Sequence, residues 1–137
     1  MPGRFETIDK SREKIKKNGL QTTAFKIAKT WFTEREKAKY FYLCSGTDNL
    51  VTSKTADNAL IAMKNWNGLK NLKNIKNKTL IVWGDKDKSY NIKQAQTLNH
   101  HISNSSLVIF KDCAHNIHLE KVKEFNNVIN KFLNKKR

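Results

Sequence analysis

The stretch TLIVWGDKD, residues 79–87, decides the fold of this chain. Thr79 to Trp83 form a short and almost wholly apolar run, which is typical of a strand that is buried on both faces. A second apolar run, LVIF at residues 107–110, leads into CAHNIHLE at residues 113–120. The sequence therefore predicts two buried strands, each followed by side chains that can carry out acid–base chemistry.

The segment between the two strands has the periodicity of a helix. Apolar residues recur at helical spacing from Ile92 to Ile102, and residues 122–133 carry the apolar face of a terminal helix. A strand, a crossover helix and a second strand of this length predict two adjacent parallel strands with a right-handed connection. The loops that leave their C-terminal ends should then lie side by side, at the edge where open α/β sheets bind ligands.

The predicted fold class is α/β, with a helical region over residues 1–75 followed by a parallel β-α-β-α unit over residues 76–137. Asn18-Gly19 is a typical helix end, because glycine takes the left-handed conformation without strain. The helices of the first region are expected over residues 10–17, from a Thr22 or Thr23 cap to Phe32, over residues 34–43 and over residues 55–66.

The net charge of +15 comes from 27 basic residues, of which 23 are lysine and 4 are arginine, and they are spread along the whole chain. Nucleic-acid interfaces favour arginine, and no aromatic residues interleave with a basic stripe here. We therefore interpret the charge as a solvated lysine-rich surface and expect no nucleic-acid partner. A basic nucleic-acid-binding module is the less favoured alternative, which salt-dependent binding would test.

Neither a membrane nor a metal or cofactor is expected as a partner. The sequence has no run of about 18 apolar residues, and its first residues, MPGRF, lack the apolar core of a signal peptide, which predicts a cytoplasmic protein. Cys44 and Cys113 lie far apart in dissimilar contexts, so both are expected to be free thiols in a reducing compartment. The four histidines are too sparse to predict a metal site.

The two strand ends supply a carboxylate and an imidazole, because Asp87 follows the first strand and His115 follows the second. A carboxylate beside an imidazole can hold it in the right tautomer and stabilise its protonated form. Such a pair is useful when a nucleophilic hydroxyl sits on the other side of the imidazole. Taken singly, Asp87 could be a turn residue and His115 a structural loop histidine. Their joint placement after two strands favours an acid and a base.

These motifs carry a family resemblance. Residues 73–133 resemble the C-terminal segment of the α/β-hydrolase fold, in the branch of lid-bearing esterases and carbon–carbon bond hydrolases. In that family, Ile-x-x-x-Thr-Leu-Ile-Val-Trp-Gly-x-x-Asp precedes the acid, and residues 75–87 have this pattern. The pattern Gly-His-x-x-x-x-Glu-x-Pro-x-x-Phe surrounds the base, and residues 114–125 have it with Ala114 in place of glycine and Val122 in place of proline.

The resemblance implies catalytic roles and a domain organisation. It assigns the acid to Asp87 and the base to His115, in the family's chain order of nucleophile, acid and histidine. It also implies that the helical residues 1–75 are the lid, and that residues 76–137 are equivalent to the last two strands of the hydrolase sheet with their helices. His118 is expected to be structural or to face the substrate, and not to be the base.

The family's nucleophile motif, Gly-x-Ser-x-Gly, is missing from the sequence. The nearest stretch, LCSG at residues 43–46, lacks the first glycine and follows a helical pattern, so Ser45 and Cys44 are disfavoured as nucleophiles. The oxyanion-hole donors would come from beside the nucleophile and from an earlier loop. We therefore expect the C-terminal part of a hydrolase for a small acyl or ester substrate, inactive alone.

Two alternatives remain open at this point. In the first, a separate chain supplies the N-terminal half and completes a split hydrolase. In the second, the chain is a non-catalytic binding or interaction remnant. In either case the strand Thr79 to Trp83 lacks the further strand that pairs with its other edge in the family. We therefore expect this edge to pair with a separate N-terminal-half chain or with a second copy of the same chain.

Overall fold

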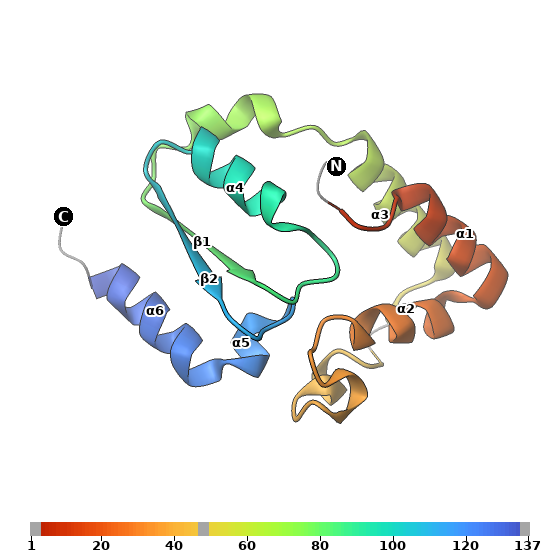
Figure 1. Cartoon of the computed structure of the whole chain (residues 1–137). Helices are drawn as coiled ribbons and strands as arrows, with labels where there is room; N and C mark the ends of the chain where they lie inside the picture. The colour runs from red at the N-terminus through yellow and green to blue at the C-terminus, as the bar shows by residue number, and fades with distance from the viewer. Residues whose placement is uncertain (1–3, 47–49, 135–137) are drawn as a thin grey trace.

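The computed structural model describes residues 4–46 and 50–134, which form a small parallel sheet with a helix on each face and a group of further helices to one side of it (Figure 1). The predicted units 1–75 and 76–137 also include residues 1–3, 47–49 and 135–137, which lie outside the described residues. The α-helices are α1 (Ile8–Asn18), α2 (Leu20–Lys29), α3 (Ser53–Asn65), α4 (Ile92–His101), α5 (Ile117–Glu120) and α6 (Val122–Asn134). Short 3₁₀ helices are η1 (Arg35–Lys37), η2 (Phe41–Leu43) and η4 (Leu69–Asn74), and the strands are β1 (Thr79–Gly84) and β2 (Ser105–Phe110).

The two strands pair in parallel, in a register that runs from Thr79 opposite Ser105 to Gly84 opposite Phe110. Helix α4 connects them and lies on one face of the sheet, while α6 lies on the other face (Figure 1). The core on the α6 side is built on Phe110, Cys113 and Ile117, with apolar side chains from both strands and α6 packed against it. The predicted α/β class and the parallel pairing are confirmed.

The first two helices meet at Gly19, whose φ of 81° is left-handed and whose N–H donates to the Ile15 carbonyl oxygen. The predicted helix end is therefore confirmed. The predicted cap of the next helix at Thr22 or Thr23 is wrong, because α2 begins at Leu20. Thr23 is buried instead, and its hydroxyl donates to the Lys14 carbonyl oxygen at 3.1 Å, which ties α2 to α1.

The helix predicted over residues 34–43 is wrong as well. The chain there makes η1 and η2, separated by an extended residue at Ala38. This break allows Phe41 to pack against Ala28 and Phe32 in a second apolar cluster, with the two phenylalanine rings 5.9 Å apart. Tertiary packing of Phe41 here outweighs local helix propensity.

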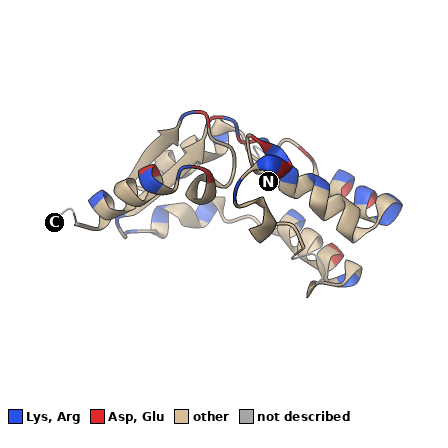
Figure 2. Ribbon diagram, turned by 90° about the horizontal axis from the view of Figure 1, so that it is seen from below, with Lys and Arg blue, Asp and Glu red and all other residues tan. Residues whose placement is uncertain are grey.

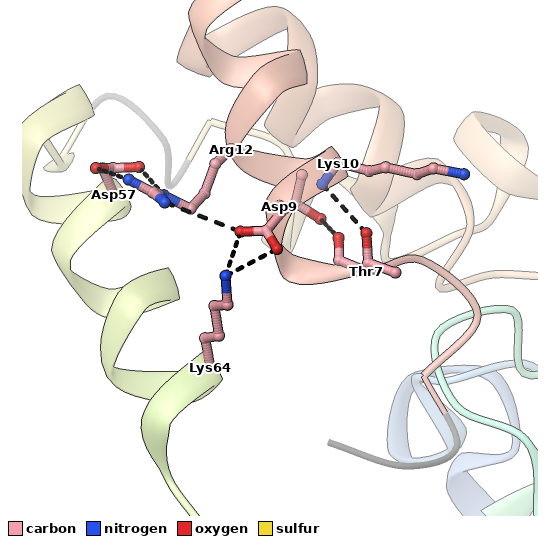
Figure 3. Close-up of polar contacts among 7 residues, drawn as sticks. Thr7, Asp9, Lys10, Arg12, Asp57 and Lys64 are labelled. Atoms are coloured by element: carbon pink, nitrogen blue, oxygen red, sulfur yellow. Dashed lines mark hydrogen bonds and ion pairs between the residues drawn. The ribbon is translucent and has the colours of Figure 1, made fainter.

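Ion pairs join α1 to α3 (Figure 3). Arg12 donates two hydrogen bonds to the Asp57 carboxylate, at 2.6 and 2.9 Å, and Lys64 donates two to Asp9, at 2.8 and 2.9 Å. Thr7 caps α1 by accepting a hydrogen bond from the Lys10 N–H. These ion pairs hold α1 and α3 side by side, although the two helices are far apart in the sequence.

Lysine and arginine residues occur on helices at both ends of the molecule (Figure 2). The absence of a nucleic-acid partner stays a prediction. Among residues 4–46 and 50–134, no helix combines the length and apolar character that crossing a bilayer requires.

The Arg12–Asp57 pair makes stability depend on pH. The hydrogen bonds from Arg12 lower the pKa of the Asp57 carboxyl. Because the folded pKa lies below the unfolded value of about 3.9, the pair stabilises the fold above that pH, and this contribution is lost as the pH falls through the folded pKa. We expect Asp57→Asn to lower the free energy of unfolding at neutral pH, and the difference from the unmodified chain to shrink below about pH 4. Urea unfolding at a series of pH values measures it.

Glu13→Gln is the matched control, because Glu13 is an exposed acidic residue on the same helix α1. It should leave the free energy of unfolding nearly unchanged. An Asp57→Asn difference that stays constant down to about pH 2 would show that the carboxylate charge contributes nothing.

The sheet leads to a second prediction. In the described ranges, β1 pairs with β2 alone, and a two-stranded sheet is marginal in water. We expect the purified chain to self-associate at rising concentration, or to unfold over a broad and low temperature range, because the second edge of β1 is open to pairing. Light scattering and thermal unfolding across a concentration series measure this. A monodisperse monomer with a sharp transition would contradict it.

Candidate active site

Asp87 lies in a tight turn directly after β1, where its backbone N–H donates to the Gly84 carbonyl oxygen at 3.0 Å. Its side chain is 5% exposed, and its Oδ1 atom accepts hydrogen bonds from the N–H groups of Ser89 at 2.6 Å and Tyr90 at 3.2 Å. These two amides fix the carboxylate, so its other oxygen points away from the turn in a defined direction. Asp87 is therefore also a turn residue, and the turn presents its carboxylate.

His115 follows β2 and meets that second oxygen. Its Nδ1 atom lies 2.9 Å from Asp87 Oδ2. A carboxylate only accepts hydrogen bonds, so Nδ1 is the donor and Nε2 is left as the acceptor of the neutral ring. The expected contact between the two residues is present, and their catalytic roles stay predictions.

Two aromatic rings flank the imidazole. The ring centroids of Trp31 and Tyr90 each lie 6.0 Å from that of His115, with interplanar angles of 36° and 34°. Trp83 at the end of β1 donates its indole N–H to the Tyr90 carbonyl oxygen at 3.1 Å, which fixes Tyr90 next to the acid turn. Neither Trp31 nor Tyr90 belongs to a sequence motif that points to the site, so the sequence did not predict a place for them there.

A cavity of about 590 Å³ opens beside these rings, between the helical residues and the two loops. His115, Trp31 and Tyr90 line it, together with Leu60 and Met63 from α3. Its size falls in the range of small-molecule pockets. His115 also lines a smaller cavity of about 270 Å³ over the sheet.

The loop that carries His115 crosses directly over the end of β1. A Cβ atom at Gly84 would lie 2.2 Å from the Ala114 carbonyl oxygen and 2.4 Å from that of Cys113, which no side chain tolerates. The same approach lets the Lys86 N–H donate to the Cys113 carbonyl oxygen at 2.9 Å. Ala114 has an ordinary negative φ, which explains why this position does without the family's glycine.

The His115 loop also docks on the helical residues. The Asn116 N–H donates to the Trp31 carbonyl oxygen at 3.0 Å, and its side-chain amide donates to Cys44 Sγ at 3.2 Å. Leu119 packs against the apolar cluster that contains Phe32. The His115 loop is therefore supported by the sheet and by the helices.

Neither Ser45 nor Cys44 lies in the strand-to-helix turn that carries the nucleophile in the family, because both directly follow η2. Ser45 lies in a bend after η2, where its N–H donates to the Phe41 carbonyl oxygen, and not in a strand-to-helix turn. Burial raises the pKa of the Cys44 thiol, against the hydrogen bond from Asn116 that lowers it. Burial and the neighbouring Glu120 raise the pKa of the Cys113 thiol to about 12. Both thiols therefore stay protonated at neutral pH.

His118 lies in α5, where its side chain is exposed and its ring centroid is 6.1 Å from that of Phe125. Asp87 contacts His115 and not His118. In the part of the chain that the structure describes, no group of three or more histidine, cysteine, aspartate or glutamate residues could hold a metal ion.

The close crossing at Gly84 gives a direct test of how the site is supported. We expect Gly84→Ala to displace the His115 loop and to lower the midpoint of thermal unfolding by several degrees, because the new methyl group would overlap two carbonyl groups. Gly46→Ala is the control for backbone strain, because nothing lies within 4 Å of a Cβ at Gly46 but its φ of 108° is one that alanine rarely adopts; it should lower the midpoint without displacing the His115 loop. An unchanged Asp87–His115 contact by NMR in Gly84→Ala would show that the crossing does not position the loop.

Comparison with known proteins places the chain in a family. A family model described as alpha/beta hydrolase fold matches residues 4–122. No curated protein matches the sequence.

Similar solved structures include several hydrolases. An esterase from Exiguobacterium antarcticum has a TM-score of 0.82 and 18% identity, over 92% of this chain and 47% of that chain. A thermophilic esterase has a TM-score of 0.73 and 25% identity, over 97% of this chain and 53% of that chain. A 2-hydroxy-6-oxo-6-phenylhexa-2,4-dienoate hydrolase from Rhodococcus has a TM-score of 0.70 and 13% identity, over 88% and 46%. The chain thus spans about half the length of the structures it matches. It belongs to the α/β-hydrolase fold family.

Proposed function

We propose that this chain is the C-terminal half of a lid-bearing hydrolase that cleaves an ester or a related bond of a small acyl substrate, with Asp87 as the acid and His115 as the base. The observation that carries the proposal is the 2.9 Å contact between Asp87 Oδ2 and His115 Nδ1 beyond the ends of two parallel strands. The membership of the family supports it. So does the presence of esterases and a dienoate hydrolase among the similar structures.

The chemistry follows from the polarity of the contact. With Nδ1 donating to Asp87, the Nε2 atom of His115 is free to take the proton of a nucleophilic hydroxyl, and Asp87 stabilises the imidazolium that results. His115 then returns this proton to the leaving group. Hydrolysis of the acyl intermediate repeats the two transfers with water.

The nucleophile must come from a segment outside this sequence. A Gly-x-Ser-x-Gly turn lies between a strand and a helix in the family and also contributes an oxyanion-hole donor. The open edge of β1 is the place where a further strand of the same sheet would pair. We therefore propose that turnover requires a segment that adds this strand and brings its serine to His115.

The helical residues 1–75 would serve as the lid over the substrate. The cavity of about 590 Å³ lies between α3, Trp31 and the His115 loop, which fits a substrate held under helices and above the acid and base. Leu60, Met63 and Trp31 line one part of it and fit an apolar acyl or aryl group. Basic side chains line another part, among them Lys14, Lys26 and Lys88.

A second arrangement has its own support. The chain spans about half of the matched structures, and β1 has a partner on one side alone in the described residues. In this arrangement, a separate polypeptide carries the nucleophile half and completes the site at an interface. The chemistry assigned to Asp87 and His115 is the same in both cases.

Reconstitution with the nucleophile half tests the proposed function. The 137-residue chain alone should hydrolyse short p-nitrophenyl esters no faster than buffer. Expressed together with the segment encoded upstream that carries Gly-x-Ser-x-Gly, it should become active. His115→Ala should then reduce kcat by about 10³-fold or more, because the base is lost. His118→Ala is the matched control and should keep kcat within about tenfold.

Two results would count against the proposal. If His118→Ala abolishes turnover and His115→Ala does not, the assignment of the base is wrong. If the upstream sequence encodes no such motif and no added nucleophile half restores activity, the chain is a non-catalytic member of the family.

A further inference from the structure

We infer that Glu120 is a positioning residue that holds the base in place by joining the His115 loop to the helical segment through both oxygens of its carboxylate. This inference rests on the proposed role of His115 as the base. The proposed mechanism gives Glu120 no role, so the inference adds a third residue to the site.

Glu120 joins two segments, and each of its carboxylate oxygens accepts hydrogen bonds from one of them. Oε1 accepts hydrogen bonds from the backbone N–H and the hydroxyl of Thr33, both at 2.6 Å. Oε2 accepts one from the Ala114 N–H at 2.6 Å and one from the Cys113 thiol at 3.5 Å. Thr33 and Ala114 are distant in sequence, so the carboxylate closes a long-range contact between helical segment and loop.

The geometry requires a carboxylate. Both sides of the junction present donors, and a carboxylate offers two accepting oxygens, whereas the amide of glutamine offers one oxygen and one donating NH₂ group. Hydrogen bonds to a charged acceptor are also shorter and stronger than those to a neutral one. Burial and the neighbouring Glu120 raise the pKa of the Cys113 thiol to about 12, so the thiol stays protonated and can donate its hydrogen bond.

The contact acts on the residue next to the base. The Ala114 N–H belongs to the backbone immediately before His115, so fixing it limits how far the imidazole can move from Asp87. The acid is fixed separately, by the amides of Ser89 and Tyr90. Each partner of the 2.9 Å contact therefore has its own anchor, and Glu120 is the anchor of the histidine.

Other contacts keep the His115 loop in its approximate position when the Glu120 contacts are lost. The Asn116 N–H bonds to the Trp31 carbonyl oxygen, and Leu119 packs into the apolar cluster with Phe32. A variant that loses the Glu120 contacts should therefore still fold. The effect to measure is therefore how firmly the His115 imidazole is held next to Asp87.

The test uses the full 137-residue chain and two NMR readouts that need no enzymatic activity. The first is the low-field signal of the His115 Nδ1 proton, assigned by its absence in His115→Ala. The second is hydrogen exchange at the Thr33 and Ala114 amides. Glu120→Gln should broaden or abolish the Nδ1 signal and accelerate exchange at the Ala114 or the Thr33 amide at least about tenfold, because glutamine offers one accepting oxygen to two sides and the junction is broken at one of them. Glu124→Gln, an exposed neighbour on α6, should change neither.

The outcomes separate a positioning role from a structural one. If Glu120→Gln lowers the unfolding midpoint but leaves the Nδ1 signal sharp, the inference is overturned. Should Glu120→Gln not fold, Glu120→Asp keeps the charge but is one methylene too short to reach both Thr33 and Ala114, and must show the same losses. If the unmodified chain has no Nδ1 signal, the proposed acid–base pair fails, and amide exchange alone then decides the role of Glu120.

Discussion

The parallel pairing of β1 with β2 is the constraint on which the rest of the structure depends. Its register places Gly84 opposite Phe110, so both strands end at the same level of the sheet. Because the strands run in the same direction, the turn after β1 and the loop after β2 begin beside each other. Asp87 and His115 then need short local excursions to meet, and an antiparallel pair would have sent these loops to opposite edges.

Contacts between side chains and backbone groups, together with one close backbone crossing, give the two loops their shape. The acid turn closes on itself through amides that bond to Asp87, and the histidine loop rests on the bare backbone of Gly84. The beginning of the described chain adds a further support, since the Phe5 N–H donates to the Ser89 carbonyl oxygen at 3.2 Å. Asp87 and His115 are therefore carried by segments that are held by hydrogen bonds and packing within the chain itself.

The features that could be predicted from the sequence are those with a local signal. Apolar runs gave the two strands, the crossover length gave their direction, and Asp87 and His115 followed from their positions after strand ends. Helix boundaries were less predictable, because Thr23 prefers a hydrogen bond to another helix over capping its own, and because Phe41 is drawn into a core.

Which residues surround the histidine could not be predicted from local signals. Trp31 reaches the imidazole only because α2 ends against the His115 loop. Glu120 stood in a recognisable motif, but its partner Thr33 could not be deduced from spacing. Such pairings are decided by how distant segments pack, which a single sequence does not encode as a pattern.

The separation of those partners along the chain has a kinetic consequence. Thr33 and Glu120 are 87 residues apart, and Cys44 and Asn116 are 72 apart, whereas α1 and α2 are joined by a single glycine. Closing long loops costs more chain entropy than closing short ones, and contacts of high sequence separation slow folding. We therefore expect the helical hairpin of α1 and α2 to form early and the surroundings of His115 to assemble last. A correctly placed imidazole would then report that the whole chain has folded.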